Sequence, residues 1–439
     1  MSLELTSPDI PADLDVVIIG AGPSGSIAAS LLHQQGKKVL VLEKQFFPRF
    51  SIGESLLPCC MQIIEEANML DAVNQAGFQF KNGAAFQFGE HYTTFNFTEK
   101  YTSGPGTTFQ VERAKFDKLL ADEAQSQGVD IRFGQTVEHV DLHSTPCLHI
   151  RNENNDTYKI NAKYILDASG FGRVLPKLLD LEQASDLPTR SAIFTHIEDN
   201  IDDPHFDRNK ILISVNPIDS SIWYWLIPFS NGRCSVGVVG EPDKLMTQTQ
   251  DLTSQLKHMI AQEPSLDKLL TNANIISDCK ELKGYSANVS TLATHQFALL
   301  GNAGEFLDPV FSSGVTIAMQ SASMAVKSLI KQLNGEHIDW QQDYCKPLMQ
   351  GVDTFRTYVQ AWYDARFQQV IFHQGGNPKI KGMICSILAG YAWDITNPYV
   401  SQSDRRLNTL VELCHPISPY SSSETELASN VALVRDTAK

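Results

Sequence analysis

The segment from Asp15 to Glu43, DVVIIGAGPSGSIAASLLHQQGKKVLVLE, constrains the fold more than any other part of the chain. An unbroken apolar run ends at Ile19 and predicts a strand that is buried on both faces of a parallel sheet. Three glycines, Gly20, Gly22 and Gly25, follow at G-x-G-x-x-G spacing. In such a turn the first glycine permits the tight bend, the second lets a pyrophosphate approach the backbone, and the third lets the helix pack on the strand.

The elements around these glycines point to a bound dinucleotide. A helix is expected to begin near Pro23, and the N–H groups and positive dipole at its start favour phosphate. A second strand ends at Glu43, whose carboxylate can hold ribose hydroxyls. Ser24, in the glycine turn, and Lys44, directly after Glu43, are expected to be further cofactor contacts. The alternative is a glycine-rich turn without a ligand.

Composition excludes several other classes of function. The 439 residues carry a net charge of -15, which argues against nucleic-acid or anionic-membrane partners. The eight cysteines are scattered without metal-ligand spacing, so neither a metal site nor a disulfide framework is expected. No long uncharged apolar segment occurs and the opening residues are too acidic for a signal peptide. These features predict a cytoplasmic protein with reduced thiols and no stable membrane insertion.

The order of patterns along the chain predicts an α/β protein with an inserted sheet. Short strand patterns follow one another between residues 185 and 290 with few helices, which is typical of an antiparallel sheet. A discontinuous Rossmann-like domain is expected over residues 1–80, 107–182 and 290–335. The sheet-based substrate domain is expected over 81–106 and 183–289, and a helical C-terminal region over 336–439.

Polar residues at the ends of these elements are candidates for the same site. Arg113 lies in the first turn of a helix, where the helix dipole disfavours a positive charge. Its position therefore indicates an anionic partner, either a phosphate or Asp117 in an ion pair. Asp167 ends a strand, and strand ends face the ligand in a doubly wound sheet. The loop after Glu43 adds three polar residues that can line or seal the cofactor site, namely Arg49, Glu54 and Ser55.

Two other features are ambiguous on local sequence alone. Lys81 lies between apolar neighbours beside an Asn-Gly bend, where a lysine is ordinarily a surface residue. Trp223 and Trp225 point to the same face of a strand, as a core pair or as the wall of a pocket.

A glycine-rich link from Gly301 to Gly314 leads into a helix over 315–332, and the start of this helix is a second position that can bind an anion.

Taken in order, these segments resemble the flavin-dependent monooxygenases of the p-hydroxybenzoate hydroxylase type, and within them the FAD-dependent halogenases. The resemblance covers about residues 13–335. The three FAD-binding segments of that superfamily match the glycine turn with Glu43 and Arg113, the stretch from Asp167 to Gly170, and Gly301-Asn302-Ala303. Pro48-Arg49 and Gly53-Glu54-Ser55 match the halogenase form of the loop after the ribose-binding acid.

Three features resemble halogenases in particular. Trp223-x-Trp225-x-Ile227-Pro228 matches their WxWxIP motif, Lys81 stands where they carry a catalytic lysine, and a tunnel motif is matched by Phe306, Pro309, Ser312 and Gly314. The resemblance implies that FADH2, delivered by a separate reductase using NADH or NADPH, forms a C4a-hydroperoxide. Chloride or bromide, held by the N–H groups of Ser313 and Gly314, then gives hypohalous acid, which reaches Lys81 through a tunnel. The same resemblance implies that the tryptophan rings keep the substrate away from the flavin.

Two departures from the family pattern bear on the substrate. Asn302 replaces the usual aspartate, so it can bind a ribityl hydroxyl but lacks the charge. Phe311 precedes Ser312 where tryptophan halogenases carry a glutamate, and their long insertions are missing. The chain therefore looks more like the halogenases of phenols or pyrroles, free or tethered to an acyl or peptidyl carrier protein. An acidic carrier would require a basic patch near the tunnel mouth, for which the candidates are Lys379, Lys381, Arg405 and Arg406.

Two other hypotheses remain open at this point. A halogenase-like oxidoreductase or monooxygenase could act on a polyene, lipid or aryl precursor without halide, as the ancestry and Asn302 suggest. A flavin-binding protein without catalysis is the third reading. Turnover without halide would indicate the second, and bound FAD that consumes no O2 on reduction would indicate the third.

Overall fold

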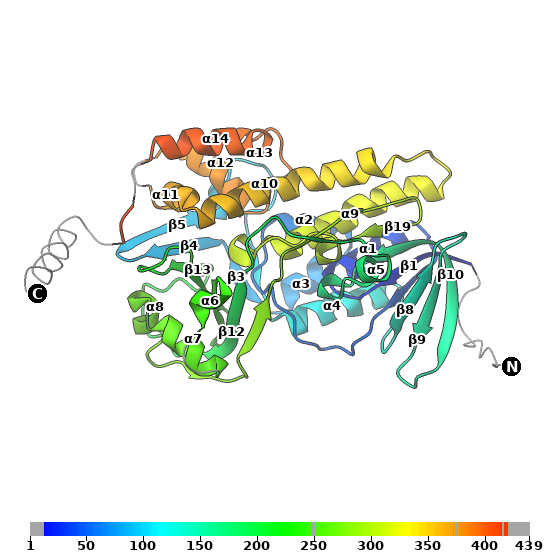
Figure 1. Ribbon diagram of the computed structural model, residues 1–439, viewed down its shortest axis with the longest axis horizontal. Helices are drawn as coiled ribbons and strands as arrows, with labels where there is room; N and C mark the ends of the chain where they lie inside the picture. The colour runs from blue at the N-terminus through cyan, green and yellow to red at the C-terminus, as the bar shows by residue number, and fades with distance from the viewer. Residues whose placement is uncertain (1–12, 247–250, 374–375, 415–416, 420–439) are drawn as a thin grey trace, which may run out of the picture.

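The fold is built on two β-sheets, with a layer of helices across one edge (Figure 1). The structure, a computed structural model, describes residues 13–246, 251–373, 376–414 and 417–419. The first sheet and its helices hold the glycine turn, and the second sheet holds Trp223 and Trp225. The α/β class with a Rossmann-like domain and an inserted sheet is confirmed.

The first sheet has the order β7-β2-β1-β10-β9-β8, with β19 also paired to β10. Strands β7, β2, β1, β10 and β19 run parallel, whereas β9 and β8 continue the sheet as an antiparallel extension. The carboxyl ends of the parallel strands therefore meet at one edge. The strand bounds are β1 Leu14–Ile19, β2 Val39–Leu42, β7 Asp130–Arg132, β8 Thr136–Asp141, β9 Cys147–Arg151, β10 Thr157–Asp167 and β19 Phe297–Leu299.

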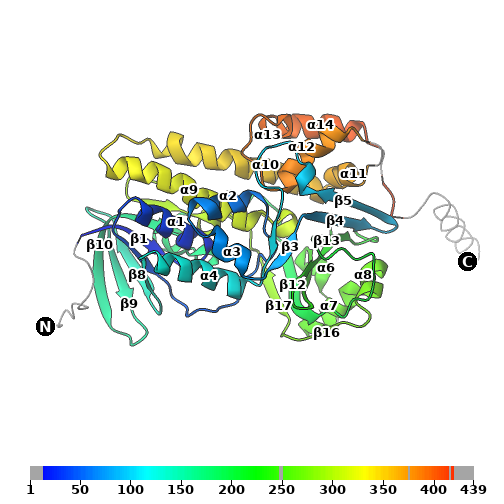
Figure 2. The same cartoon turned by 180° about the vertical axis from the view of Figure 1, so that it is seen from behind.

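Strand β1 is buried on both faces, as its apolar run predicts. Val16 and Ile18 belong to one apolar cluster, and Val17 and Ile19 belong to another on the opposite face of the sheet. Figure 2 shows the neighbouring helices α1, α2, α3 and α4 on this part of the molecule. The helices of this domain are α1 Pro23–Gln34, α2 Cys59–Glu66, α3 Leu70–Gln75, α4 Arg113–Ser126, α5 Val174–Leu178 and α9 Ser313–Leu333.

The second sheet has the order β16-β12-β15-β14-β13-β4-β5, with β17 also paired to β12. It is antiparallel except that β4 runs parallel to β13. Its strands are β4 Gly83–Phe88, β5 His91–Asn96, β12 Ser191–Glu198, β13 Lys210–Val215, β14 Trp223–Pro228, β15 Arg233–Gly240, β16 Asn274–Ile275 and β17 Lys280–Lys283. The helices beside it are α6 Pro242–Leu245, α7 Leu252–Ile260 and α8 Pro264–Leu269.

Short ribbons and turns join the two sheets. The ribbons are β3 Gln79–Lys81 with β6 Thr108–Gln110, and β11 Glu182–Ala184 with β18 Ala287–Val289. The short helical turns are η1 Phe97–Glu99, η2 Gly170–Gly172, η3 Gly301–Ala303 and η4 Pro309–Phe311. Because β3 ends at Lys81 and β4 starts at Gly83, the lysine lies where the chain passes into the second sheet.

The C-terminal helices cover the top of both domains in Figure 1. They are a π-helical turn η5 Gln341–Cys345, then α10 Lys346–Tyr363, α11 Arg366–Phe372, α12 Pro378–Leu388, α13 Pro398–Ser401 and α14 Ser403–Glu412. All eight cysteines are free. Within the described ranges, none of the helices is both long and apolar enough to cross a bilayer.

Candidate active site

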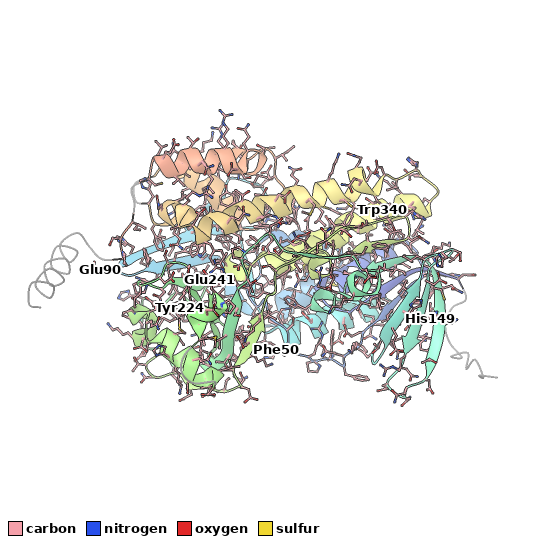
Figure 3. All side chains as sticks on the ribbon, in the orientation of Figure 1. Phe50, Glu90, His149, Tyr224, Glu241 and Trp340 are labelled. Carbon is pink, nitrogen blue, oxygen red and sulfur yellow. The ribbon has the colours of Figure 1, made fainter. Side chains whose placement is uncertain are left out.

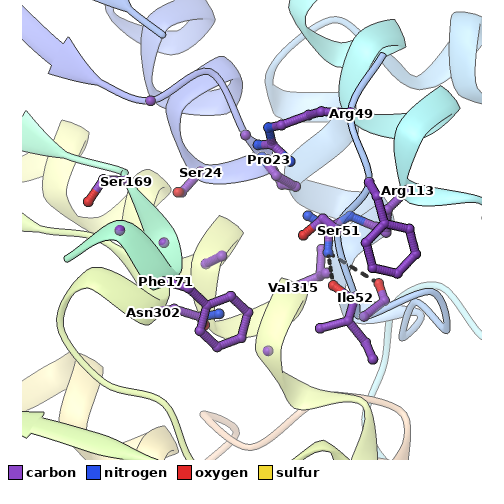
Figure 4. Close-up of a pocket in the computed structure, with 18 of the residues that line it drawn as sticks. Pro23, Ser24, Arg49, Ser51, Ile52, Arg113, Ser169, Phe171, Asn302 and Val315 are labelled. Carbon is purple, nitrogen blue, oxygen red and sulfur yellow. Dashed lines mark hydrogen bonds between the residues drawn. The ribbon is translucent and has the colours of Figure 1, made fainter. Parts of the chain in front are cut away.

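A cavity of about 690 Å³ is lined from both sheets, and this volume is typical of cofactor and small-molecule sites. It extends from the ends of β1 and β2 to the tryptophans of β14, and Figure 4 shows part of its wall. The candidate site residues from the sequence that line it include Gly20, Gly22, Ser24, Glu43, Lys44, Arg49, Glu54, Ser55, Arg113, Trp223, Trp225, Asn302, Phe306, Pro309, Ser312 and Gly314.

At one end, the cavity has the geometry of a nucleotide site. Helix α1 starts at Pro23 with Gly22 as its N-cap and without a side-chain cap, so its first N–H groups are available to a phosphate. The Glu43 carboxylate accepts hydrogen bonds from the N–H groups of Ala21 (2.9 Å) and Gln45 (2.8 Å). This fixes the acid at the cavity wall, where its remaining lone pairs can accept ribose hydroxyls.

Two predicted cofactor glycines lie behind the wall and act through packing. A Cβ on Gly25 would lie 1.9 Å from the carbonyl oxygen of Gly20, so only glycine lets α1 pack this closely on β1. A Cβ on Gly301 would lie 2.8 Å from the Cβ of Ala318 on α9. Both positions bring elements together around the cavity, and neither is among the residues that line it.

The structure does not place Asp167 as a cofactor contact. Its side chain is fully buried and accepts hydrogen bonds from the N–H groups of Ser169 (2.9 Å) and Leu175 (2.6 Å). Burial raises the pKa of the Asp167 carboxyl, although these hydrogen bonds favour its ionised form. The strand end does face the cavity, but the residues that line it there are Ala168, Ser169 and Gly170. Asp167 instead orders the turn behind them.

Two arginines near the glycine turn share one carboxylate, Asp117. Arg113 donates to it through Nε at 2.7 Å and to the carbonyl of Ile52 through Nη1 at 2.6 Å. Arg49 donates to the same carboxylate at 3.1 Å. The ion pair that the sequence offered as an alternative for Arg113 is therefore present. Arg49 is the cation nearer the phosphate-binding turn, because a Cβ on Gly22 would lie 3.4 Å from its Nη2 (Figure 4).

Asn302 presents an unpartnered acceptor at the cavity wall. Its side-chain oxygen Oδ1 is buried without a hydrogen-bond partner, while its backbone carbonyl accepts from Arg173 at 3.1 Å. A buried orphan acceptor of this kind is costly unless a ligand satisfies it. The residues present therefore fit FAD, with Gly22 and the start of α1 for the pyrophosphate, Glu43 for the adenosine ribose, and Asn302 for a ribityl hydroxyl.

The other end of the cavity is aromatic. The rings of Trp223 and Trp225 lie on the same face of β14 with centroids 5.9 Å apart, and both line the cavity. The Trp223 Nε1 donates to the hydroxyl of Tyr363 at 3.1 Å, and that hydroxyl donates to the buried carboxylate of Asp308 at 2.7 Å. The hydroxyl of Tyr285 donates to the same carboxylate at 3.0 Å. The C-terminal helix α10 thus orients Trp223 through Tyr363.

Replacing Tyr363 with Phe should destabilise the protein by about 2–3 kcal/mol, because it leaves the Trp223 N–H unpaired and removes a donor from buried Asp308. Tyr358, on the same helix, donates a single hydrogen bond to the carbonyl of Tyr399, at 2.9 Å. Tyr358→Phe is the matched control and should lose only about 1 kcal/mol. Urea unfolding of both variants tests this, and equal losses would contradict the bridging role of Tyr363.

The predicted halide residues lie where η4 passes into α9. Ser312 precedes the helix in a left-handed conformation (φ 56°), which is strained for a residue with a side chain and is often retained at functional sites. No side chain caps α9, so its first N–H groups face the cavity end of the helix. Gly314 lines the cavity, whereas the Ser313 side chain is buried behind it.

Lys81 is fully buried, contrary to the usual position of a lysine beside an Asn-Gly bend. Its Nζ donates to Ser55 Oγ and to the carbonyl of Leu56, each at 2.7 Å, and lies 5.3 Å from the centroid of the Phe97 ring. Burial lowers the pKa of Lys81 to about 7, while the nearby Cys60 thiol opposes this shift. Lys81 does not itself line the cavity, but its partner Ser55 does. One side chain therefore separates the amine from the cavity.

Several cavity residues had no local sequence signal. Phe50, Phe171 and Phe194 line the cavity, and His196, which packs against Phe50, is bonded to Glu54. They come from a loop, a helical turn and a strand that are far apart in the chain. Only their packing brings them together, so spacing rules could not have found them.

The four candidate basic residues are exposed on α12 and α14, which lie at the top of Figure 1. Figure 3 places the cavity residue Phe50 at the opposite, lower edge, so these cations are not at that rim. Helix α12 instead lies near Lys81. It packs on η1, whose Phe97 ring contacts the Lys81 amine, and its Gly382 carbonyl accepts a hydrogen bond from the N–H of Tyr101 at 3.0 Å. Their relation to a tunnel mouth stays a prediction.

Together, the parallel sheet, the glycine turn and the aromatic sheet cavity define the class of FAD-dependent oxidoreductases. The profile described as "FAD binding domain" matches residues 13–344. The chain belongs to this FAD binding domain family, and it is an FAD-dependent enzyme. In the described residues, no group of His, Cys, Asp or Glu side chains is arranged to hold a metal ion.

Its relatives include halogenases and one flavoprotein of a different description. The 1H-pyrrole-2-carbonyl-[peptidyl-carrier protein] chlorinase of Pseudomonas fluorescens is 27% identical over 408 residues, covering 86% of this chain and 89% of that protein. A flavoprotein/dehydrogenase from Cytophaga hutchinsonii is 42% identical with a TM-score of 0.87, covering 91% of this chain and 98% of the other. The myxobacterial chondrochloren halogenase is 26% identical with a TM-score of 0.71, covering 92% and 97%.

Proposed function

We propose that this protein is a FADH2-dependent halogenase that installs chlorine or bromine on an electron-rich aromatic, a phenol or a pyrrole. The observation that carries the proposal is Lys81, a buried amine one side chain away from a cavity that fits FAD. Burying a lysine among neutral partners costs stability, and such groups concentrate at functional sites. The halogenases among the relatives support the same reading.

Bound reduced flavin supplies the two electrons that, with O2, convert a halide into hypohalous acid. The protein positions the reactants. The N–H groups at the start of α9, at Ser313 and Gly314, bind the halide. The rings of Trp223 and Trp225 line the cavity, where they keep an aromatic substrate from the flavin. The hypohalous acid must then pass Ser55 to reach Lys81.

The pKa of Lys81, lowered to about 7, gives both protonation states a role at neutral pH. The ammonium form donates a hydrogen bond that orients hypohalous acid and increases its electrophilicity. The neutral amine can attack the halogen, forming an N–X bond and releasing water, and the haloamine then gives X⁺ to the ring carbon. That carbon loses a proton, and the amine is restored. Each route needs the amine in the position that Ser55 and Leu56 hold.

The surroundings of the helix start favour an electron-rich substrate. Phe311, in the place where tryptophan halogenases carry a glutamate, packs edge-on against Trp362 (5.8 Å) and Phe367 (5.4 Å). It offers no base for the ring proton, which suits phenols and pyrroles that react without one. The chlorinase relative acts on a carrier-bound pyrrole, and we extend a carrier-tethered substrate and a separate flavin reductase to this chain.

A second candidate is a halide-independent oxidoreductase or monooxygenase that acts on a polyene, lipid or aryl precursor. It is favoured by the 42% identity with a flavoprotein/dehydrogenase. The sulfur atoms near the lysine also favour it, since Cys60 interacts with Lys81 and Met61 Sδ accepts a hydrogen bond from Thr108 at 3.3 Å. Thiols and thioethers are oxidised by electrophilic halogen.

The deciding experiment supplies the purified protein with FAD, a flavin reductase, NADH and O2, with and without bromide. Monochlorodimedone traps free hypobromous acid, and a phenol and a pyrrole test enzymatic transfer. Bromide-dependent products that disappear in Lys81→Ala are expected. Substrate turnover without halide would favour the second candidate. Undiminished regioselective halogenation by Lys81→Ala would remove the lysine from the mechanism.

A further inference from the structure

A carboxylate and an imidazole form a pair at the aromatic end of the cavity. Glu54 lines the cavity and is 2% exposed, and its Oε1 lies 2.8 Å from the Nε2 of His196. Glu54 comes from the loop between β2 and α2, and His196 from β12. The imidazole is 20% exposed and Glu54 only 2%, so the pair extends from the cavity wall toward solvent.

The surroundings of His196 favour its charged form. Burial by itself would lower the pKa of His196, but the hydrogen bond and negative charge of Glu54 outweigh it, so the pKa is raised. Glu112, held by Arg233 at 3.9 Å, acts in the same direction, and Lys280 on β17 opposes it. The imidazole ring packs between Phe50 (5.9 Å) and Phe229 (5.4 Å).

Halide oxidation consumes one proton more than a dihydroflavin supplies. The balance X⁻ + O2 + 2e⁻ + 3H⁺ → HOX + H2O takes two electrons and two protons from a dihydroflavin, and the third proton comes from solvent. The wall near the tryptophans is otherwise largely apolar, with Phe194, Ile211 and Ile227. Arg113, which also lines the cavity, is held in an ion pair with Asp117. Glu54 is the buried acid on this wall with a partner that solvent can reach.

We propose that His196 and Glu54 deliver this solvent proton to the oxygen atom that leaves as water. The Glu54 carboxylate takes the Nε2–H proton of the His196 imidazolium and passes it to the reacting oxygen, and the neutral imidazole left behind is reprotonated from solvent. The inference rests on the proposed halide oxidation, because hydroxylation of a substrate by dihydroflavin and O2 consumes no net proton. Glu54 is a catalytic residue in this scheme, and His196 acts through it.

The test uses the full chain and three variants. His196→Gln places an amide nitrogen where Nε2 donates, so the bond to Glu54 is kept but the titration is lost. Glu54→Gln removes the carboxylate. His258→Gln, on an exposed face of α7, is the matched control. Histidine NMR of the flavin-free protein should show His196 titrating above the ordinary range in the wild type, and lower in Glu54→Gln.

The kinetic arm follows hypobromous acid formation with reduced FAD, O2 and bromide between pH 5.5 and 9. His196→Gln should lose about 10²-fold in rate, lose the basic limb of the pH profile, and recover with added imidazole. The FAD affinity of His196→Gln should stay within about twofold, since the His196 side chain does not line the cavity. His258→Gln should match the wild type.

An unchanged rate and pH profile in His196→Gln would overturn the inference. So would a rate loss in that variant that imidazole does not restore and that accompanies weaker FAD binding. In the NMR experiment, a His196 titration within the ordinary range would also overturn it. A wild-type protein that makes no hypobromous acid would instead overturn the proposed function. In that case the NMR titration still reports whether Glu54 and His196 share a proton.

Discussion

Replacing Lys81 with Met should abolish halogen transfer and, at acidic pH, make the protein more stable. Wild-type Lys81 is fully buried, with the Ser55 hydroxyl, the Leu56 carbonyl and the Phe97 ring as neutral partners. Methionine fills a similar volume without a charge. The gain comes from removing a buried ammonium, and the loss comes from leaving the two oxygen acceptors unpaired, which costs about 1–3 kcal/mol.

The pH dependence of this effect has a defined sign. The folded pKa of Lys81 lies at about 7, below its ordinary value of 10.5. Between these values the unfolded chain holds one more proton than the native protein, so wild-type stability rises with pH across this window. The advantage of Lys81→Met is therefore largest below pH 7, at about 3–5 kcal/mol before the lost hydrogen bonds are subtracted, and it shrinks toward pH 10.

Thermal or urea unfolding at several pH values between 6 and 10 measures this difference directly. Lys257→Met, at an exposed position on α7, is the control and should show no such pH dependence. A stability difference that stays constant across this pH range would mean that the amine has a charged partner or access to water. Retained halogen transfer in Lys81→Met would separately refute its catalytic role.

The second large effect is expected within the glycine turn, where two substitutions of the same size should act differently. Gly25→Ala places a Cβ 1.9 Å from the backbone oxygen of Gly20, so α1 and β1 must separate. We expect a loss of more than about 3 kcal/mol and little folded protein that retains FAD. Gly22→Ala meets only the Arg49 side chain, at 3.4 Å, and its backbone (φ -69°, ψ -172°) is open to any residue.

Gly22→Ala should therefore fold normally, within about 0.5 kcal/mol of wild type, and yet bind FAD about 10–100 times more weakly, because a methyl group occupies the approach of the pyrophosphate. Differential scanning of the flavin-free proteins and fluorescence titration with FAD separate the two effects. Equal destabilisation by both variants, or wild-type FAD affinity in Gly22→Ala, would contradict this division of roles.

The nucleotide half of the site was predictable because its signal is local. The strand, turn, helix and second strand from Leu14 to Leu42 are contiguous in the chain. The role of each glycine in the turn follows from backbone sterics alone. The resemblance placed Trp223, Trp225 and Asn302, and the structure brings all three to the wall of one cavity. Their catalytic roles stay predictions.

Local patterns could not decide which polar side chains face the ligand and which stabilise the fold. Asp167 ends a strand at the right edge, but the following turn curls back so that its carboxylate caps backbone N–H groups. Arg113 had two acceptable partners in the sequence, and the shared carboxylate of Asp117 was selected only when the loop with Arg49 packed beside α4.

The sequence by itself determined the dinucleotide-binding unit, because glycine spacing and apolar runs act through the backbone over a few residues. The burial of Lys81 and the pairing of Glu54 with His196 were decided only by the tertiary structure. Lys81 and Ser55 are 26 residues apart, and Glu54 and His196 are 142 apart. The solvation and charge of such groups depend on which distant segments enclose them, and packing sets that.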